Sequence, residues 1–135
     1  MTVSASYLCA VCGEVASTVT LVATGQPDPR LTPEPPGVPP GVSMILADHA
    51  SLSIAGGPVS VTVGPVPVEA VAAALATGRA SALFEIDSEL APFWCPRCRA
   101  AYCRDHYRTE TLYDDGFFDC IRGTCPKGHQ RTLED

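Results

Sequence analysis

Basic residues are scarce in this 135-residue chain. It has nine lysines and arginines, Lys127 being the one lysine, against fifteen aspartates and glutamates, and its formal net charge is −6 at pH 7. Nucleic-acid binding normally needs a net positive face that displaces the counterions of the phosphate backbone. The arginines between Arg97 and Arg108 could form a local basic patch, but acidic residues lie among them. We therefore expect a mixed, solvated surface and a partner other than nucleic acid.

Long hydrophobic runs and targeting signals are also missing. Residues Met1–Tyr7 have neither a basic region nor an apolar core of the kind that a signal peptide needs. The most apolar stretch, Met44–Val68, is broken by charge, by Gly56-Gly57 and by prolines, which is typical of short strands and not of a membrane span. We expect a cytoplasmic protein without a membrane partner. In that reducing compartment, seven cysteines favour metal binding over disulfides.

The motifs of several metal-dependent enzymes are absent as well. A zinc deaminase needs His-x-Glu before its cysteine pair, and His49 is followed by Ala-Ser. The His-Glu-x-x-His helix of metalloproteases does not occur. Trp94-Cys95-Pro-Arg-Cys98 resembles the redox motif of thioredoxin-like proteins, so Cys95 and Cys98 form an alternative redox pair. That family requires a long helix after the second cysteine, where this chain has further metal-ligand spacing.

What the chain has instead is four pairs of metal-binding side chains. Each pair is separated by two or three residues, and four such pairs are what two closed tetrahedral zinc sites require. Catalytic zinc usually keeps one coordination position open, so we expect two structural zinc ions and no catalytic residue. The pairs are Cys9 and Cys12, Cys95 and Cys98, Cys103 and His106, and Cys125 and His129.

The run from Cys95 to His106 resembles the centre of cross-brace zinc fingers of the FYVE type and, more loosely, the RING type, both with a treble-clef element. In those families the first and third pairs bind one ion, and the second and fourth pairs bind the other. The resemblance therefore implies one site with Cys9, Cys12, Cys103 and His106, and one site with Cys95, Cys98, Cys125 and His129.

The spacing also favours this interleaving, because the four residues between Cys98 and Cys103 suffice for a short strand that carries consecutive pairs to opposite ends. A sequential arrangement, with Cys9, Cys12, Cys95 and Cys98 on one ion, is the alternative. The chain departs from the families in having 82 residues between its first two pairs. It also lacks the basic lipid-binding signature of FYVE domains.

Three further residues have more than one interpretation. Cys120 lies in an apolar strand-like run, where it is a small buried side chain, a ligand that replaces Cys125 or His129, or a reactive nucleophile. Trp94 precedes a ligand pair and is expected to pack against the site, the alternative being an aromatic residue that binds a partner. His49 is isolated and is interpreted as an ordinary surface or core histidine.

We expect a small α+β fold that forms one zinc-stapled domain over residues 1–135, with short antiparallel strands, one central helix and a Pro-rich loop. Seven prolines between Gly25 and Gly41 indicate an extended surface segment, or else a ligand for SH3-like or WW-like domains. The expected parts are a zinc knuckle and strand (1–23), the Pro-rich loop or linker (25–41), a hairpin–helix–strand insert (43–91) and a zinc-binding module (92–135). The expected elements are strands at Val15–Ala23, Ala50–Ala55, Val59–Val63 and Ala82–Ile86, and a helix at Val68–Thr77 that begins after Pro67 and ends before Gly78.

These features favour a non-enzymatic adaptor that presents a zinc-ordered surface to another protein. One alternative is a RING-like module that recruits a ubiquitin-like conjugating partner, and it would need an apolar groove between the zinc loops. The others are a nucleic-acid-binding zinc finger and the thiol redox protein.

Overall fold

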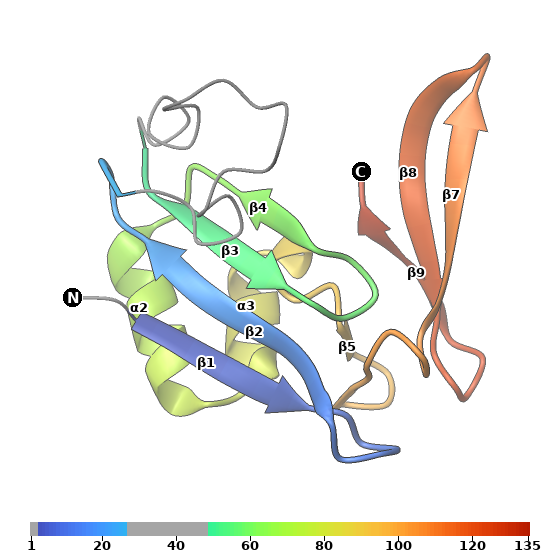
Figure 1. The fold of residues 1–135 in the computed structure, drawn as a ribbon, viewed down its shortest axis with the longest axis horizontal. Helices are drawn as coiled ribbons and strands as arrows, with labels where there is room; N and C mark the ends of the chain where they lie inside the picture. The colour runs from blue at the N-terminus through green and yellow to red at the C-terminus, as the bar shows by residue number, and fades with distance from the viewer. Residues whose placement is uncertain (1–2, 27–48) are drawn as a thin grey trace, which may run out of the picture.

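The computed structural model describes residues 3–26 and 49–135, so most of the predicted Pro-rich segment lies outside the described residues. The N-terminal half of the fold is a four-stranded antiparallel sheet (Figure 1). Its strands occur in chain order and are β1 (Val3–Leu8), β2 (Val15–Val22), β3 (Ser51–Ala55) and β4 (Val61–Val63). The predicted strand at β2 and the predicted Gly-Gly hairpin are thus present, and β1 is an additional strand.

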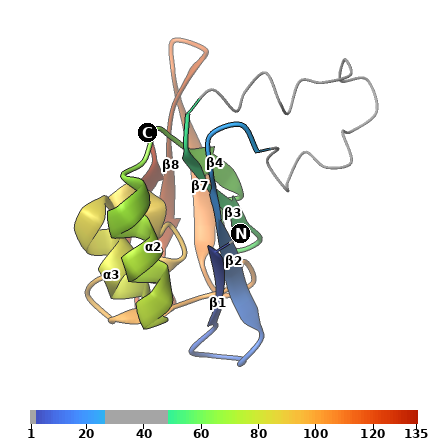
Figure 2. The same cartoon turned by 90° about the vertical axis from the view of Figure 1, so that its left-hand side faces the viewer.

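Two helices cover one face of this sheet (Figure 2). Helix α2 (Val68–Thr77) matches the prediction, and Gly78 ends it in the left-handed conformation with φ 71°. Its buried residues are Val71, Ala74 and Leu75, whereas Val68 at its start is 45% exposed. The inner face of the helix therefore begins at Val71.

The predicted strand at Ala82–Ile86 is wrong, because this segment is part of a second helix, α3 (Ala80–Ile86). Its buried residues Ala80 and Leu83 are three positions apart, which is a helical spacing and not the two-residue period of a strand. A 3-10 turn, η2 (Ser88–Leu90), follows. The fold is small and α+β, as predicted, but it has two α-helices in its described part instead of one.

The main hydrophobic core lies between the helices and the four-stranded sheet. Cross-strand pairing aligns Val19 with Ile54 and Leu21 with Leu52, and all four side chains are buried. Phe93 stacks on the ring of Tyr7 from β1, with ring centroids 5.0 Å apart. A second, cysteine-rich core combines Cys9, Ala16 and Val59 with residues of the C-terminal half, and Val61 and Ala101 pack against both cores.

The C-terminal half consists of a short hairpin and a three-stranded antiparallel sheet that projects to one side of the molecule (Figure 1). Arg131 joins this sheet to the helical layer: its guanidinium donates a hydrogen bond to the Ala91 carbonyl at 2.6 Å and lies 5.3 Å from the ring centroid of Phe84. The elements are β5 (Trp94–Cys95), β6 (Ala100–Ala101), β7 (Arg108–Asp114), β8 (Phe117–Thr124) and β9 (Gln130–Glu134). No helix in the described ranges is long and apolar enough to cross a membrane.

Candidate metal centres

The turn between β1 and β2 holds the first pair of cysteines. The Cys9 amide donates to the Glu14 carbonyl at 2.7 Å, and the Gly13 amide donates to the Cys9 carbonyl at 2.9 Å. Gly13 has φ 76°, a left-handed conformation that glycine adopts without a Cβ penalty. The Val11 amide points at Cys9 Sγ, 3.4 Å away. This turn therefore holds both cysteines at one end of the sheet, with Cys9 buried and Cys12 exposed.

The turn between β5 and β6 presents the second pair in a similar way. The Arg99 amide donates to the Cys95 carbonyl at 2.8 Å, and Arg99 has a left-handed φ of 55°. The Cys98 amide approaches Cys95 Sγ at 3.5 Å. Strand β6 comes after this turn, so the helix that a thioredoxin-like redox motif needs is not formed at Cys98.

The remaining two pairs are held by the ends of the other strands. Cys103 and His106 lie between β6 and β7, and the His106 amide donates to the Cys103 carbonyl at 3.0 Å. Cys125 and His129 lie in the turn between β8 and β9, where the His129 amide points at Cys125 Sγ from 3.4 Å.

The structure brings the eight side chains together in two Cys3His groups, each able to hold a zinc ion. Within each group the four ligand atoms all lie within 4.8 Å of one another. The knuckle cluster consists of Cys9, Cys12, Cys103 and His106, and the module cluster consists of Cys95, Cys98, Cys125 and His129. This is the interleaved arrangement; the sequential set of Cys9, Cys12, Cys95 and Cys98 is not formed.

The distances fit a tetrahedral zinc ion. A Zn–S bond of about 2.3 Å places two sulfurs of a tetrahedron roughly 3.7 Å apart. Cys12 Sγ and Cys103 Sγ are separated by 3.7 Å, and Cys98 Sγ and Cys125 Sγ by 3.6 Å. A disulfide would need about 2.05 Å. Both clusters thus have the donor set and the edge length of a structural zinc site.

Both histidines direct Nδ1 toward the sulfurs. In the knuckle cluster, His106 Nδ1 lies 3.6 Å from Cys9 Sγ and 3.1 Å from Cys103 Sγ. In the module cluster, His129 Nδ1 lies 3.6 Å from Cys95 Sγ and 3.2 Å from Cys98 Sγ. The two clusters therefore use the same donor atom of the imidazole, which leaves Nε2 for an outer partner.

Burial and backbone hydrogen bonds act in opposite directions on the thiols. Burial raises the pKa of Cys9, but hydrogen bonds from the backbone of Cys103, Cys12 and Val11 outweigh it and bring the pKa to about 6. For Cys125, burial also raises the pKa, and backbone hydrogen bonds from His129 and Lys127 leave it lowered. Each cluster thus contains one cysteine whose environment already favours the thiolate that zinc binds.

Tyr102 supports the module cluster from outside the ligand set. A side-chain hydrogen bond with Cys98 raises the pKa of Tyr102, and burial raises it further, so the phenol stays neutral. Its ring also makes an edge contact with buried Tyr107, with centroids 6.0 Å apart. Sequence reasoning missed this role, although the position of Tyr102 directly before Cys103 was a signal that it lies between both clusters.

The other candidate residues lie outside both clusters. Cys120 is buried in β8, opposite Leu112, and belongs to neither Cys3His group. Trp94 packs on Phe84 of α3, with ring centroids 5.0 Å apart, and so belongs to the main hydrophobic core and not to the cysteine-rich core, against which it was expected to pack. His49 is half-buried and belongs to neither cluster.

The comparison with protein families gives one match, to a family described as Domain of unknown function (DUF8328), over residues 1–135. The chain therefore belongs to this family. No curated protein and no solved structure matches it.

Proposed function

We propose that this member of the DUF8328 family binds two structural zinc ions in a cross-brace arrangement and works as a non-catalytic protein–protein interaction module. The observation that carries the proposal is the pair of closed Cys3His clusters, whose ligand atoms have the spacing of a zinc tetrahedron. The proposed ligands are Cys9, Cys12, Cys103 and His106 for one ion, and Cys95, Cys98, Cys125 and His129 for the other.

The donor count supports a structural and not a catalytic role. Four protein ligands fill a tetrahedral zinc ion, whereas catalytic zinc typically has three protein ligands and a water. A bound ion supplies a cross-link between distant turns and offsets the charge of the thiolates. The protein's own residues do the rest: the backbone amides at Val11, Cys98 and His129 point at sulfurs and fix their directions.

Exposed apolar side chains support the interaction role. At the far end of the β7–β8 hairpin, Tyr113 is 68% exposed, Phe117 77% and Phe118 50%. Aromatic residues grouped at an exposed site mark surfaces that bind other proteins. Asp114 and Asp115, in the same turn, are acidic, which agrees with a protein partner better than with nucleic acid.

Elemental mass spectrometry of the purified native chain, together with native mass spectrometry, tests the zinc proposal. We expect two zinc ions per chain, one ion after Cys12→Ser and two ions in a Cys120→Ala control. A wild-type chain with fewer than two ions, or one that gains disulfides between these cysteines, would contradict the proposal.

Cross-linking and affinity enrichment from the source cells test the interaction role. We expect a protein partner that the wild-type chain captures and that a Phe117→Ser/Phe118→Ser variant captures several-fold less, while Val68→Ser, at an exposed site on α2, is the matched control. Equal capture by all three chains would remove the hairpin end as the binding surface.

A further inference from the structure

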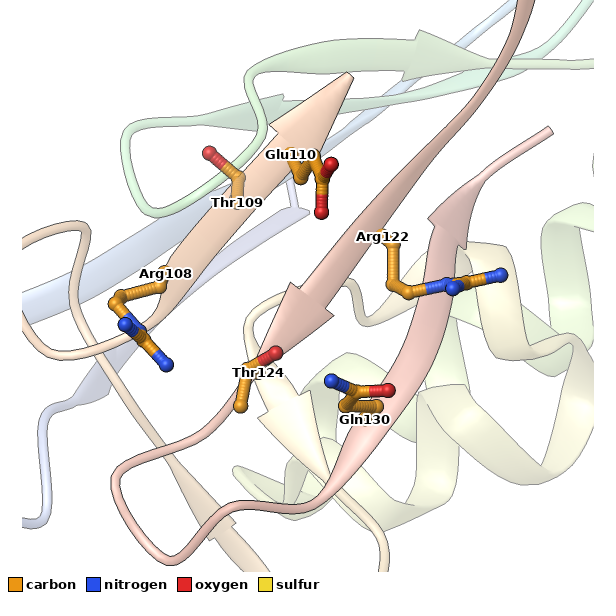
Figure 3. A pocket seen from close by; sticks show the side chains of 6 residues that line it. All are labelled: Arg108, Thr109, Glu110, Arg122, Thr124 and Gln130. Carbon is orange, nitrogen blue, oxygen red and sulfur yellow. The ribbon is translucent and has the colours of Figure 1, made fainter. Parts of the chain in front are cut away.

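A pocket of about 280 Å³ lies on the β7–β8–β9 sheet (Figure 3). It is separate from both clusters and from the aromatic end of the hairpin. Arg108 and Arg122 flank Thr124 and Gln130, and Glu110 lies on the opposite side. The lining residues are Arg108, Thr109, Glu110, Arg122, Thr124 and Gln130.

The strand register places these side chains together. Arg108 is paired with Thr124, which is paired with Gln130 on the next strand, and Glu110 is paired with Arg122. Directly paired residues, and residues two apart on one strand, lie on the same face of a sheet. The two arginines are therefore diagonal neighbours on one face, each with a hydroxyl, amide or carboxylate group beside it.

Neither arginine is neutralised within the described part of the chain. No ion pair or hydrogen bond of either guanidinium occurs there, although Glu110 is directly opposite Arg122 in the register. Arg131, on the same sheet, differs, because its guanidinium donates to Ala91 and covers the ring of Phe84. Two guanidiniums against one carboxylate leave the pocket with one net positive charge, and each guanidinium presents a planar set of donors.

We infer that this pocket binds a small carboxylate ligand with an adjacent N–H group, the chemistry of an N-acylated α-amino acid. Arg108 and Arg122 bind the carboxylate, and Thr124 and Gln130 offer further hydrogen bonds to it. Glu110 accepts a hydrogen bond from the neighbouring N–H. A monoanion balances the pocket's charge, whereas a phosphate dianion would leave one net negative charge beside Glu110. The small volume fits one such group and not a large ligand.

This inference goes beyond the proposed function, but the pocket depends on the metal clusters, because its lining residues lie close to proposed metal ligands in the sequence. Arg108 comes two residues after His106, Thr124 directly precedes Cys125, and Gln130 directly follows His129. Strands β7, β8 and β9, which carry the pocket's side chains, therefore each have one end within two residues of a proposed metal ligand. The metal content of every variant must be measured with its binding, so that loss of the fold is distinguished from loss of the pocket.

Solution NMR of the zinc-loaded chain tests the inference, with N-acetylglycine, acetate and inorganic phosphate as probes. We expect saturable shifts of the Arg108 and Arg122 Nε–H signals with N-acetylglycine in the millimolar range. Arg108→Gln and Arg122→Gln should each weaken binding about tenfold, because each removes a charge-assisted hydrogen bond. Arg104→Gln, at an exposed arginine outside the pocket, is the control and should bind as the wild type does.

One further variant and one further probe test the role of Glu110 and the source of the ligand. Glu110→Gln should reduce the preference for N-acetylglycine over acetate and allow phosphate to bind more tightly. N-acetyl-triglycine distinguishes the sources: binding at least as tight as that of N-acetylglycine assigns the pocket to chain ends, and weaker binding assigns it to a free ligand. Non-saturable shifts, wild-type affinity in either arginine variant while both zinc ions are retained, or tighter binding of phosphate than of N-acetylglycine by the wild type would overturn the inference.

Discussion

The two clusters have the same donor set but connect the chain over very different distances. Cys12 and Cys103, in the knuckle cluster, are 91 positions apart, whereas Cys98 and Cys125, in the module cluster, are 27 apart. Closing the longer loop costs about 1 kcal/mol more by the logarithmic dependence of loop entropy on length. The knuckle cluster thus fastens one half of the fold to the other, while the module cluster organises the C-terminal half itself.

The surroundings of the two clusters differ as well, in how exposed their cysteines are. Cys12 is exposed at the end of the β1–β2 turn, whereas Cys95 and Cys125 are buried and Tyr102 donates to Cys98. The core around Tyr107 contains cysteines of both clusters, and Cys9, Ala16 and Val59 of the N-terminal half contribute to it. The knuckle cluster therefore links the two halves of the chain, whereas the module cluster joins turns within the C-terminal half.

The largest effect should come from removing both metals. In model zinc fingers a structural ion contributes about 10 kcal/mol or more of folding free energy, so a chelator should unfold residues 92–135. The sheet–helix half keeps its own apolar core and should retain its helices. Hydrogen exchange with and without chelator measures this. A chain that keeps its full thermal stability after zinc removal would contradict the structural role of the ions.

Breaking the clusters one at a time should separate their roles. Cys98→Ser should abolish protection from hydrogen exchange in β7, β8 and β9 and lower the free energy of unfolding by several kcal/mol. Cys12→Ser should leave the four-stranded sheet and the module folded but increase exchange at the β1–β2 turn, with a smaller loss of stability. Identical exchange patterns in the two variants would show that the clusters are not distinct in role.

A smaller effect should distinguish the clusters by their outer partners. Tyr102→Phe removes the hydrogen bond to Cys98 and should weaken zinc binding at the module cluster about tenfold, the low end of what outer partners of metal ligands contribute. The knuckle cluster should be unaffected. Zinc competition with a chromogenic chelator measures both sites, and Tyr113→Phe, at an exposed tyrosine, is the control. Equal weakening of both sites would place Tyr102 in the general packing instead.

The smallest effect should come from Cys120→Ala. This thiol is buried in β8 but belongs to neither cluster, so we expect about 1 kcal/mol of destabilisation from lost packing and an unchanged content of two zinc ions. Denaturant unfolding and elemental analysis check both values. Loss of one ion would return Cys120 to the ligand set.

Local signals in the sequence predicted much of the fold. Gly56-Gly57 between two β-rich runs indicated the β3–β4 hairpin, and Pro67 and Gly78 indicated both ends of α2. The prediction failed at Ala82–Ile86, because a short apolar run has no clear period and only the contacts of Ala80 and Leu83 decide that it is helical.

Of the candidate sites, the two groups of four were suggested by spacing and by the cross-brace resemblance. The support from Tyr102 and the pocket around Arg108 and Arg122 could not be predicted in this way. Tyr102 depends on where two turns meet in space, and the pocket depends on strand register, since a one-residue slip of β8 would move Arg122 to the other face.

The interleaved order of the pairs also determines when each metal site can be completed during synthesis of the chain. Cys9 and Cys12 leave the ribosome first, but Cys103 follows Cys12 by 91 residues. At about 5 to 20 residues per second, this interval is roughly 5 to 20 seconds. During that time the first two thiols have no partners, and any ion that they bind is incompletely coordinated. The protein's earliest metal ligands therefore wait longest for their partners, and the cross-link that joins its two halves becomes possible only once His106 has been made.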